Sequence, residues 1–258
     1  MESVDFHAAR ALLEWQMELG ADECISDAPV DRYALPQTLA KPKKAEEKPH
    51  LTRGPVKLAE RDPVAEARTA AAAARTVAEL RTAMEEFDLC DLKRGARNML
   101  FSDGIIGAPV MIMGEFPSRD EDRIGKPFSG AAGHLLDRMF AAIDMGRSNQ
   151  KAPIYMTNVL PWRPPHNRDP KPEEIAMMLP FLERHIVLAE PKVLVIMGNW
   201  ACQALLAKRG VARLRGQWTK AVDRPALPMF HPSQLLRTPA AKKEAWADLL
   251  SVKAAVGK

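Results

Sequence analysis

The sequence predicts an α/β protein, a three-layer α/β/α sandwich around a central, mostly parallel, four-stranded sheet. Short and nearly continuous apolar runs at 108–114, 153–159 and 192–198 are typical of strands that are buried on both faces. A fourth such strand is expected at 226–230, and segments with helical spacing of apolar residues separate the runs. Because strands that alternate with helices favour parallel pairing through right-handed crossovers, this order predicts the sandwich.

Three helices are expected between the strands. They span residues 130–145, 170–191 and 199–210, and each has apolar residues at helical spacing. Pro170 and Pro172 fit the start of the second helix, because the first turn needs no backbone N–H donor from them. Gly210 is a suitable end for the third helix.

The chain is expected to have three parts. Residues 1–28 form an N-terminal helical extension, and residues 29–62 form a flexible linker that is rich in Pro, Lys and Glu. Residues 63–258 form the main domain, which starts with an alanine-rich helix at 63–86. Asp62 is a plausible cap for that helix, with Pro63 at its first position. The extension either tethers a partner or is dispensable, and the sequence leaves both open.

Composition limits the class of protein. The 258 residues are 47% hydrophobic, 27% charged and 6% aromatic, which is ordinary for a globular protein. No apolar run approaches the roughly 18 residues of a membrane span, and the first residues lack the basic start of a secretory signal. The three cysteines are far apart and include no C-x-x-C pair. We therefore expect a cytoplasmic protein, whose net charge of +4 permits nucleic-acid binding without demonstrating it.

Polar and aromatic residues follow three of the expected strands, in GEFPSRDED, TNVLPWRPPHNRDP and HPSQLLR. Ligands of open parallel sheets bind beyond the carboxyl ends of the strands, so one site built from all three segments is the economical interpretation. Asn158 can present a donor and an acceptor to a heterocycle, Phe128 can stack on its ring, and His231 can donate to an oxygen that gains charge.

Each of these residues alone has a more ordinary explanation, such as a turn, a core plug or a surface group. The functional interpretation is favoured because the residues occur together at successive strand ends. Other common sites are unsupported, since H-E-x-x-H, G-x-G-x-x-G, P-loop and G-x-S-x-G patterns are all absent.

Four blocks of sequence follow one another along the chain: GEFPSRDEDRIGKPFSGAAGHLLD, TNVLPWRPPHNRDPKPEEI, PKVLVIMGNWACQALL, and HPSQLLR followed by KKEAWADL. In this order they resemble the uracil-DNA glycosylase superfamily, most closely its family 4, and the resemblance covers Phe87 to the C-terminus. It implies a monomeric DNA repair enzyme that flips uracil, or another deaminated base, into a pocket and hydrolyses its N-glycosidic bond.

The resemblance also implies roles for individual residues. Phe128 would stack on uracil, Asn158 would hydrogen-bond its edge, and His231 would stabilise the negative charge of the departing base. Glu121 would activate water, and Glu115 matches a functional glutamate of the family. Asn167 and Phe116 are further expected to line the base site, and the residues expected to contact DNA are Arg163, Ser233, Leu235, Leu236 and Arg237, with the two leucines as a wedge.

The family resembles [4Fe-4S] proteins that have four cysteine ligands. Here Cys90 occupies one ligand position, and Phe87, Trp162 and Met178 occupy the other three. One thiolate cannot hold a cluster, so we expect neither an iron–sulfur cluster nor another metal. The four side chains are expected to converge into an apolar cluster instead.

Besides the missing cysteines, the chain departs from the family pattern in the turn after the first main strand. Phe116 replaces a small residue, and Ser118 replaces a glycine that could take a positive φ. A phenylalanine here could narrow the base pocket. The leading interpretation is a glycosylase acting on uracil. The alternatives are a superfamily enzyme for another deaminated base and a catalytically impaired DNA- or protein-binding module on the same fold, with its pocket narrowed by Phe116.

Overall fold

The computed structural model describes residues 6–19 and 61–257. The chain divides into two compact units, Met1–Val56 and Lys57–Lys258. In the first unit, helix α1 spans Phe6–Glu18, and the side chains of residues 10–19 are exposed. The predicted linker lies outside the described residues except for its last two positions.

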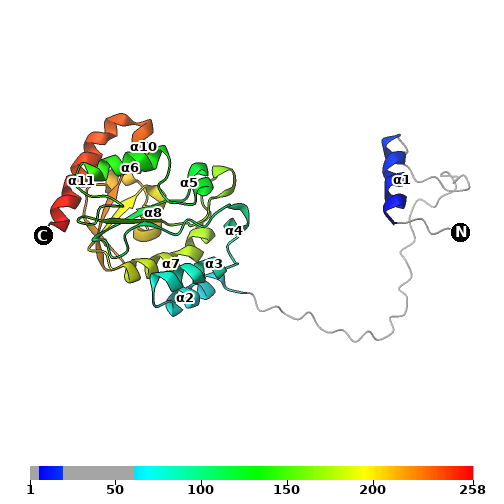
Figure 1. Ribbon diagram of the computed structural model, residues 1–258, viewed down its shortest axis with the longest axis horizontal. Coiled ribbons are helices and arrows are strands. Elements are labelled where there is room, and N and C mark those ends of the chain that lie inside the picture. Colours follow the sequence, from blue (N-terminus) through cyan, green and yellow to red (C-terminus); the bar gives the residue numbers. More distant parts are fainter. Residues whose placement is uncertain (1–5, 20–60, 258) are drawn as a thin grey trace, which may run out of the picture. The chain divides into compact units, whose positions relative to one another are not determined.

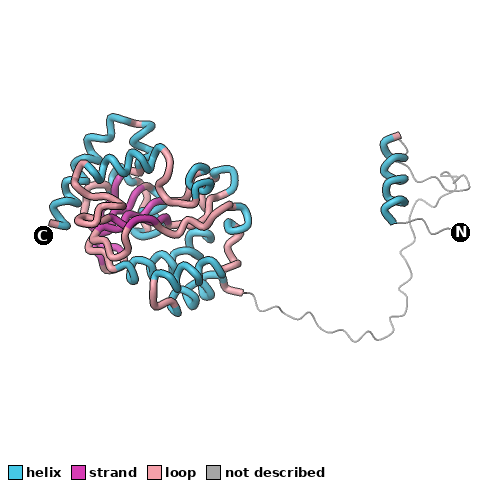
Figure 2. The backbone as a smooth tube through the Cα atoms, viewed as in Figure 1, coloured by secondary structure: helices cyan, strands magenta, loops and turns pink. Residues whose placement is uncertain are grey.

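The second unit contains a six-stranded sheet in the order β1-β3-β2-β4-β6-β5. Figure 2 shows its strands in the middle of the unit, with helices on either side. The four central strands run parallel, as predicted, and each edge carries one short antiparallel strand that the sequence did not predict. Edge strands of two or three residues carry too little periodicity to be recognised. The bounds are β1 Asp103–Gly104, β2 Val110–Gly114, β3 Ile154–Asn158, β4 Val193–Met197, β5 Thr219–Ala221 and β6 Arg224–Met229.

Helices cover both faces of this sheet, which confirms the three-layer α/β/α sandwich. Figure 1 shows α2, α3 and α7 on one side and α6, α10 and α11 on the other. The bounds are α2 Pro63–Ala73, α3 Val77–Glu86, α4 Leu92–Gly95, α5 Arg119–Ile124, α6 Ala131–Ala141, α7 Pro172–Ala189, α8 Asn199–Leu206, α9 Val211–Leu214, α10 Pro232–Arg237 and α11 Lys242–Val256. One 3₁₀ turn spans Pro165–Asn167 and another spans Pro239–Ala241.

Two hydrophobic clusters fill the space between the layers. Successive side chains of a strand point to opposite faces, and β2 follows this rule. Met111 and Met113 belong to the larger cluster, beneath α2, α3 and α7. Val110 and Ile112 belong to the smaller cluster, with Phe128. The strands are therefore buried on both faces, which explains their nearly continuous apolar sequences.

The alanine-rich segment forms two helices, where the sequence predicted one. Helix α2 begins at Pro63 with Asp62 as its cap, as predicted, but ends at Ala73. Thr76 then caps α3 by accepting a hydrogen bond from the Glu79 N–H. Arg184 of α7 donates twice to the Ala74 carbonyl, at 2.9 and 2.7 Å, and so satisfies the end of α2. This tertiary contact and the threonine cap outweigh the helix propensity of alanine.

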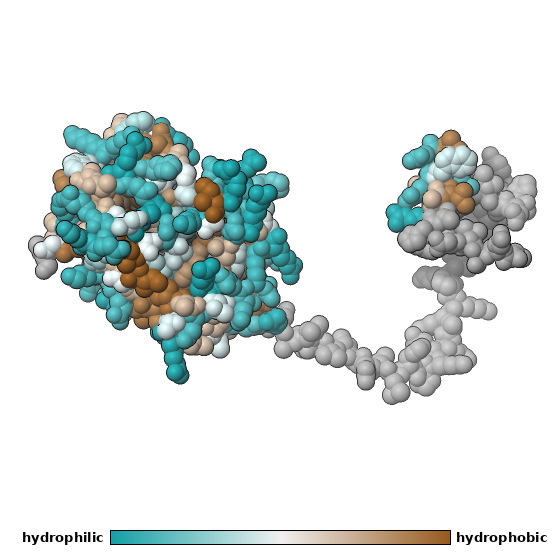
Figure 3. Space-filling view, in the orientation of Figure 1, coloured by the Kyte–Doolittle hydropathy of each residue, from teal (hydrophilic) through white to brown (hydrophobic). Residues whose placement is uncertain are grey.

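The face of the second unit seen in Figure 3 is mostly hydrophilic, with scattered apolar patches. Within residues 6–19 and 61–257, no helix combines the length and apolar character that crossing a bilayer requires.

Candidate active site

Phe128, Asn158 and His231 meet beyond the carboxyl end of the sheet. The rings of Phe128 and His231 stack with centroids 5.6 Å apart and an interplanar angle of 26°. Gly114, the last residue of β2, lies against the side chains of Asn158 and Phe128. A Cβ atom on it would be 2.2 Å from Asn158 Oδ1 and 2.6 Å from Phe128 Cζ. The glycine is therefore required by the close approach of an amide and a phenyl ring, and the three side chains form one site.

Asn158 is the last residue of β3, and its side chain is buried. Within the part of the chain that the structure describes, its Nδ2 has no hydrogen-bond partner. A buried donor without a partner costs about 1–3 kcal/mol, so such groups are rare in folded proteins. An amide donor held in this state beside an aromatic ring is suited to a ligand that brings its own acceptor.

The backbone of Phe128 is held on both sides. Its φ of 52° lies in the left-handed region, which is uncommon for a residue with a bulky side chain. Its N–H donates to Glu121 Oε1, and its carbonyl accepts a 3.0 Å hydrogen bond from Arg147 Nη2. A Cβ on Gly133 would lie 1.6 Å from the same carbonyl oxygen, so only glycine fits there. These contacts fix where the phenyl ring lies.

Glu121 links this residue to the start of α5. Its Oε2 accepts a 2.8 Å hydrogen bond from the Ser118 N–H, and Ser118 Oγ accepts one from the Glu121 N–H, which completes a capping box. Ser118 has a φ of −74°, so the serine at this position needs no glycine-like conformation. The predicted role of Glu121 in water activation stays a prediction, and the structure adds a positioning contact to Phe128.

His231 is the cap of α10, where its Nδ1 accepts a hydrogen bond from the Ser233 N–H at 3.2 Å. Burial and the positive charge of Arg237 lower the pKa of His231 to about 4. The imidazole is therefore neutral near pH 7, and its proton sits on Nε2 because Nδ1 is an acceptor. This tautomer gives His231 a hydrogen-bond donor for an oxygen that gains negative charge.

Glu115 reaches from the end of β2 to the start of α8. Its Oε1 accepts a 2.9 Å hydrogen bond from the Trp200 N–H. A Cβ on Gly198 would lie 2.4 Å from the Glu115 Cδ, so the glycine makes room for the carboxylate. Burial raises the pKa of Glu115, opposed by the N–H groups of Trp200 and Asn199.

Three predicted residues lie in other surroundings. Asn167 is exposed, and its Oδ1 accepts a 2.9 Å hydrogen bond from Arg163 Nε, so these two predicted residues form a pair of their own. Phe116 packs against the larger hydrophobic cluster, whereas Phe128 belongs to the smaller one. Occlusion of the base site by Phe116 stays a prediction.

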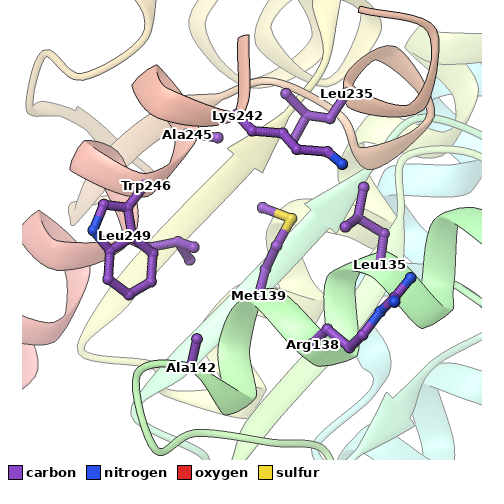
Figure 4. Close-up of a pocket in the computed structure, with 9 residues that line it drawn as sticks. All are labelled: Leu135, Arg138, Met139, Ala142, Leu235, Lys242, Ala245, Trp246 and Leu249. Atoms are coloured by element: carbon purple, nitrogen blue, oxygen red, sulfur yellow. The ribbon is translucent and has the colours of Figure 1, made fainter. Parts of the chain in front are cut away.

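The two leucines of the predicted wedge differ in solvent exposure. Leu235 is fully buried, whereas Leu236 is 43% exposed, which leaves Leu236 as the side chain that is free to contact DNA. Arg237 is exposed beside it. Leu235 also lines a surface groove of about 420 Å³ between α6 and the α10–α11 segment, beside Met139 and Trp246 (Figure 4). Neither Phe128 nor Asn158 nor His231 lines this groove.

Phe87, Cys90, Trp162 and Met178 are all buried in the larger cluster. The ring of Phe87 packs edge-on against Phe181, which lies one turn after Met178 on α7, with centroids 5.4 Å apart. Burial raises the pKa of the Cys90 thiol to about 11. Phe87 and Trp162 offer no ligand atom, Met178 offers a thioether where clusters are held by thiolates, and burial disfavours the thiolate of Cys90. This donor set does not fit an iron–sulfur cluster.

Sequence reasoning missed two polar residues around the site. Arg147, in the loop before β3, bonds the Phe128 carbonyl, and isolated arginines give no sequence signal for such a role. Asp122, the residue after Glu121, is buried, although acidic clusters in loops are usually solvated. Its Oδ1 accepts from the Arg97 and Asn98 N–H groups, which anchors α5 to the preceding loop.

Comparison with known proteins identifies the family of the chain. Residues 101–250 match the family described as the uracil DNA glycosylase superfamily. A type-4 uracil-DNA glycosylase of Archaeoglobus fulgidus is 35% identical over 66% of this chain and 87% of its own length. The type-4 uracil-DNA glycosylase of Sulfurisphaera tokodaii is 34% identical over 60% of this chain and 73% of its own length. That of Thermotoga maritima is 33% identical over 57% of this chain and 77% of its own length. The chain therefore belongs to the uracil-DNA glycosylase superfamily, as a glycosylase with type-4 relatives.

Proposed function

We propose that this protein excises uracil, or a related deaminated base, from DNA and that it does so as a monomer without an iron–sulfur cluster. The observation that carries the proposal is the buried Asn158 amide beside the ring of Phe128, whose donor finds no partner among residues 6–19 and 61–257. A pyrimidine edge supplies the missing acceptor, and an aromatic face supports its ring.

The reaction breaks the bond between the base nitrogen and C1′ of the sugar. The bonding electron pair leaves with the base, and Nε2–H of neutral His231 donates to the oxygen that gains charge. Water forms the new bond to C1′, and its proton passes to a carboxylate. Glu121 and Glu115 are the carboxylates proposed for this step.

DNA is proposed to reach the site past the segment that carries Ser233, Leu236 and Arg237. Flipping a base leaves a gap in the duplex, and an exposed apolar side chain can occupy it. Leu236 has that exposure, and the neighbouring arginine can contact a phosphate. Arg163 is proposed as a further phosphate contact.

An excision assay tests the proposal. Purified protein is incubated with single- and double-stranded oligonucleotides that contain one uracil, and the resulting abasic sites are converted to strand breaks with alkali and measured. We expect cleavage that falls when Asn158 or His231 is replaced. DNA binding that weakens with salt, without any base release, would contradict the enzymatic proposal and favour a binding module. Phe116→Gly in the same assay reports occlusion, which would appear as a faster rate.

A further inference from the structure

Arg147 is not among the predicted site residues, yet its guanidinium donates hydrogen bonds to three segments around the ring of Phe128. Its Nη2 donates to the Phe128 carbonyl at 3.0 Å. Its Nη1 donates to Asp103 of β1 at 2.6 Å, and its Nε donates to Asp137 of α6 at 2.8 Å. The side chains of Arg147 and Asp103 are 19% and 22% exposed, whereas that of Asp137 is 43% exposed, so the pair with Asp103 is the better shielded of the two ion pairs.

The backbone of Phe128 needs such support. A bulky residue with a φ of 52° is held against its conformational preference, and such strain persists only where the surroundings over-determine it. Glu121 holds the N–H of this residue, and Arg147 holds its carbonyl. These two contacts therefore hold the peptide on which the position of the phenyl ring depends.

We infer that Arg147 is a positioning residue, which fixes the Phe128 ring for stacking on the flipped base. The inference rests on the proposed function. Arg147 acts through Phe128 and has no contact with the base itself. Asp103 and Asp137 orient the guanidinium, because each accepts from a different edge of it.

A double-mutant cycle tests this assignment in the full-length chain. Single-turnover uracil release from a duplex oligonucleotide is measured for wild type, Arg147→Met, Phe128→Ala and the double variant. We expect Arg147→Met to slow release by roughly 10- to 100-fold, the order of loss caused by a misplaced binding group. In the Phe128→Ala background the same substitution should change the rate by no more than about two-fold, because the ring it positions is absent.

A merely structural role would give a different result. Equal losses in both backgrounds, or no loss in the wild-type background, would overturn the assignment. Arg184→Met is the matched control, because Arg184 also donates to a backbone carbonyl but on the α2–α7 side. We expect it to lower the melting temperature without changing the rate of release.

A second variant covers the case in which Arg147→Met does not fold. Asp103→Asn keeps the guanidinium and removes one of its charged acceptors. We expect a smaller loss that also disappears in the Phe128→Ala background, and persistence of the loss there would count against the inference. Wild-type protein that releases no uracil rejects the proposed function, whereas active wild type with unaffected variants rejects the positioning role alone.

Discussion

The two sides of the sheet hold their key aromatic residues in different ways. Phe128 is fixed through its backbone, by hydrogen bonds to the side chains of Glu121 and Arg147. Phe87 and Trp162 lie in the larger cluster, where apolar packing surrounds them. Hydrogen bonds are directional and can hold a ring at one place, whereas apolar packing depends chiefly on volume. Phe128 is also packed in an apolar cluster, so what distinguishes it is that the side chains of Glu121 and Arg147 bond its backbone N–H and carbonyl.

The larger cluster should respond to loss of volume. Trp162→Ala removes a buried indole that is 3% exposed, and such changes cost about 3–5 kcal/mol of unfolding free energy. Denaturant unfolding measures this effect. Trp218→Ala is the control, because Trp218 is 40% exposed and should cost far less. Similar losses for both tryptophans would contradict the packing role of Trp162.

The base site should respond to loss of one donor. Asn158→Leu has a similar shape but cannot pair with a base, and we expect uracil release to slow by roughly 10²- to 10³-fold. The melting temperature should stay equal or rise, because the substitution removes a buried donor that has no hydrogen-bond partner in the described part of the chain. A large loss of stability together with activity would show that the amide serves the fold.

Glu121→Gln keeps the size of the side chain and weakens its hydrogen bonds to the backbone N–H groups of Ser118 and Phe128. One amide nitrogen replaces a carboxylate oxygen, so either the Ser118 N–H or the Phe128 N–H loses its acceptor. We expect release to slow by about 10-fold or more and the protein to lose on the order of 1–2 kcal/mol of stability. Rates and unfolding curves that match wild type would remove Glu121 from both its proposed roles.

Acid should destabilise the fold through two histidines, His185 of α7 and His231, the cap of α10. Burial lowers the pKa of His185 to about 3, and that of His231 to about 4. The unfolded chain takes up these protons near pH 6.5 and the folded chain does not, so stability is present above pH 6.5 and falls as pH drops towards 4. Each histidine contributes a slope of about 1.4 kcal/mol per pH unit there. Unfolding of His185→Gln should show a shallower slope, and an unchanged slope would contradict the burial argument.

Much of the fold followed from apolar runs. The four parallel strands were predictable because burial on both faces leaves nearly continuous hydrophobic sequence, as in VMIMG of β2. The break between α2 and α3 was not, because it depends in part on Arg184, which lies more than a hundred residues further along the chain. Helix α8 ends at Leu206, with Ala207 in the left-handed conformation, instead of continuing to Gly210. A local sequence pattern reveals neither a contact with a distant residue nor a left-handed alanine at the end of a helix.

The site was predictable to a similar degree. Phe128, Asn158 and His231 were expected to meet because parallel strands end at the same edge, and they do. The partners of Phe128 were not predictable in full. Glu121 lies seven residues before it, but Arg147 comes from a loop whose path depends on the whole sandwich. The burial of Leu235 likewise follows from the packing of α10, which the dipeptide Leu-Leu does not specify.

Uracil release by iron-free protein tests the central claim most directly. The full-length chain is purified with a chelator, its iron content is measured, and single-turnover release from uracil-containing duplex DNA is followed. We expect iron-free protein to release uracil, with unchanged rates when Cys90 is replaced by Ala. Iron-free protein that is inactive and recovers activity when iron and sulfide are restored would contradict the account.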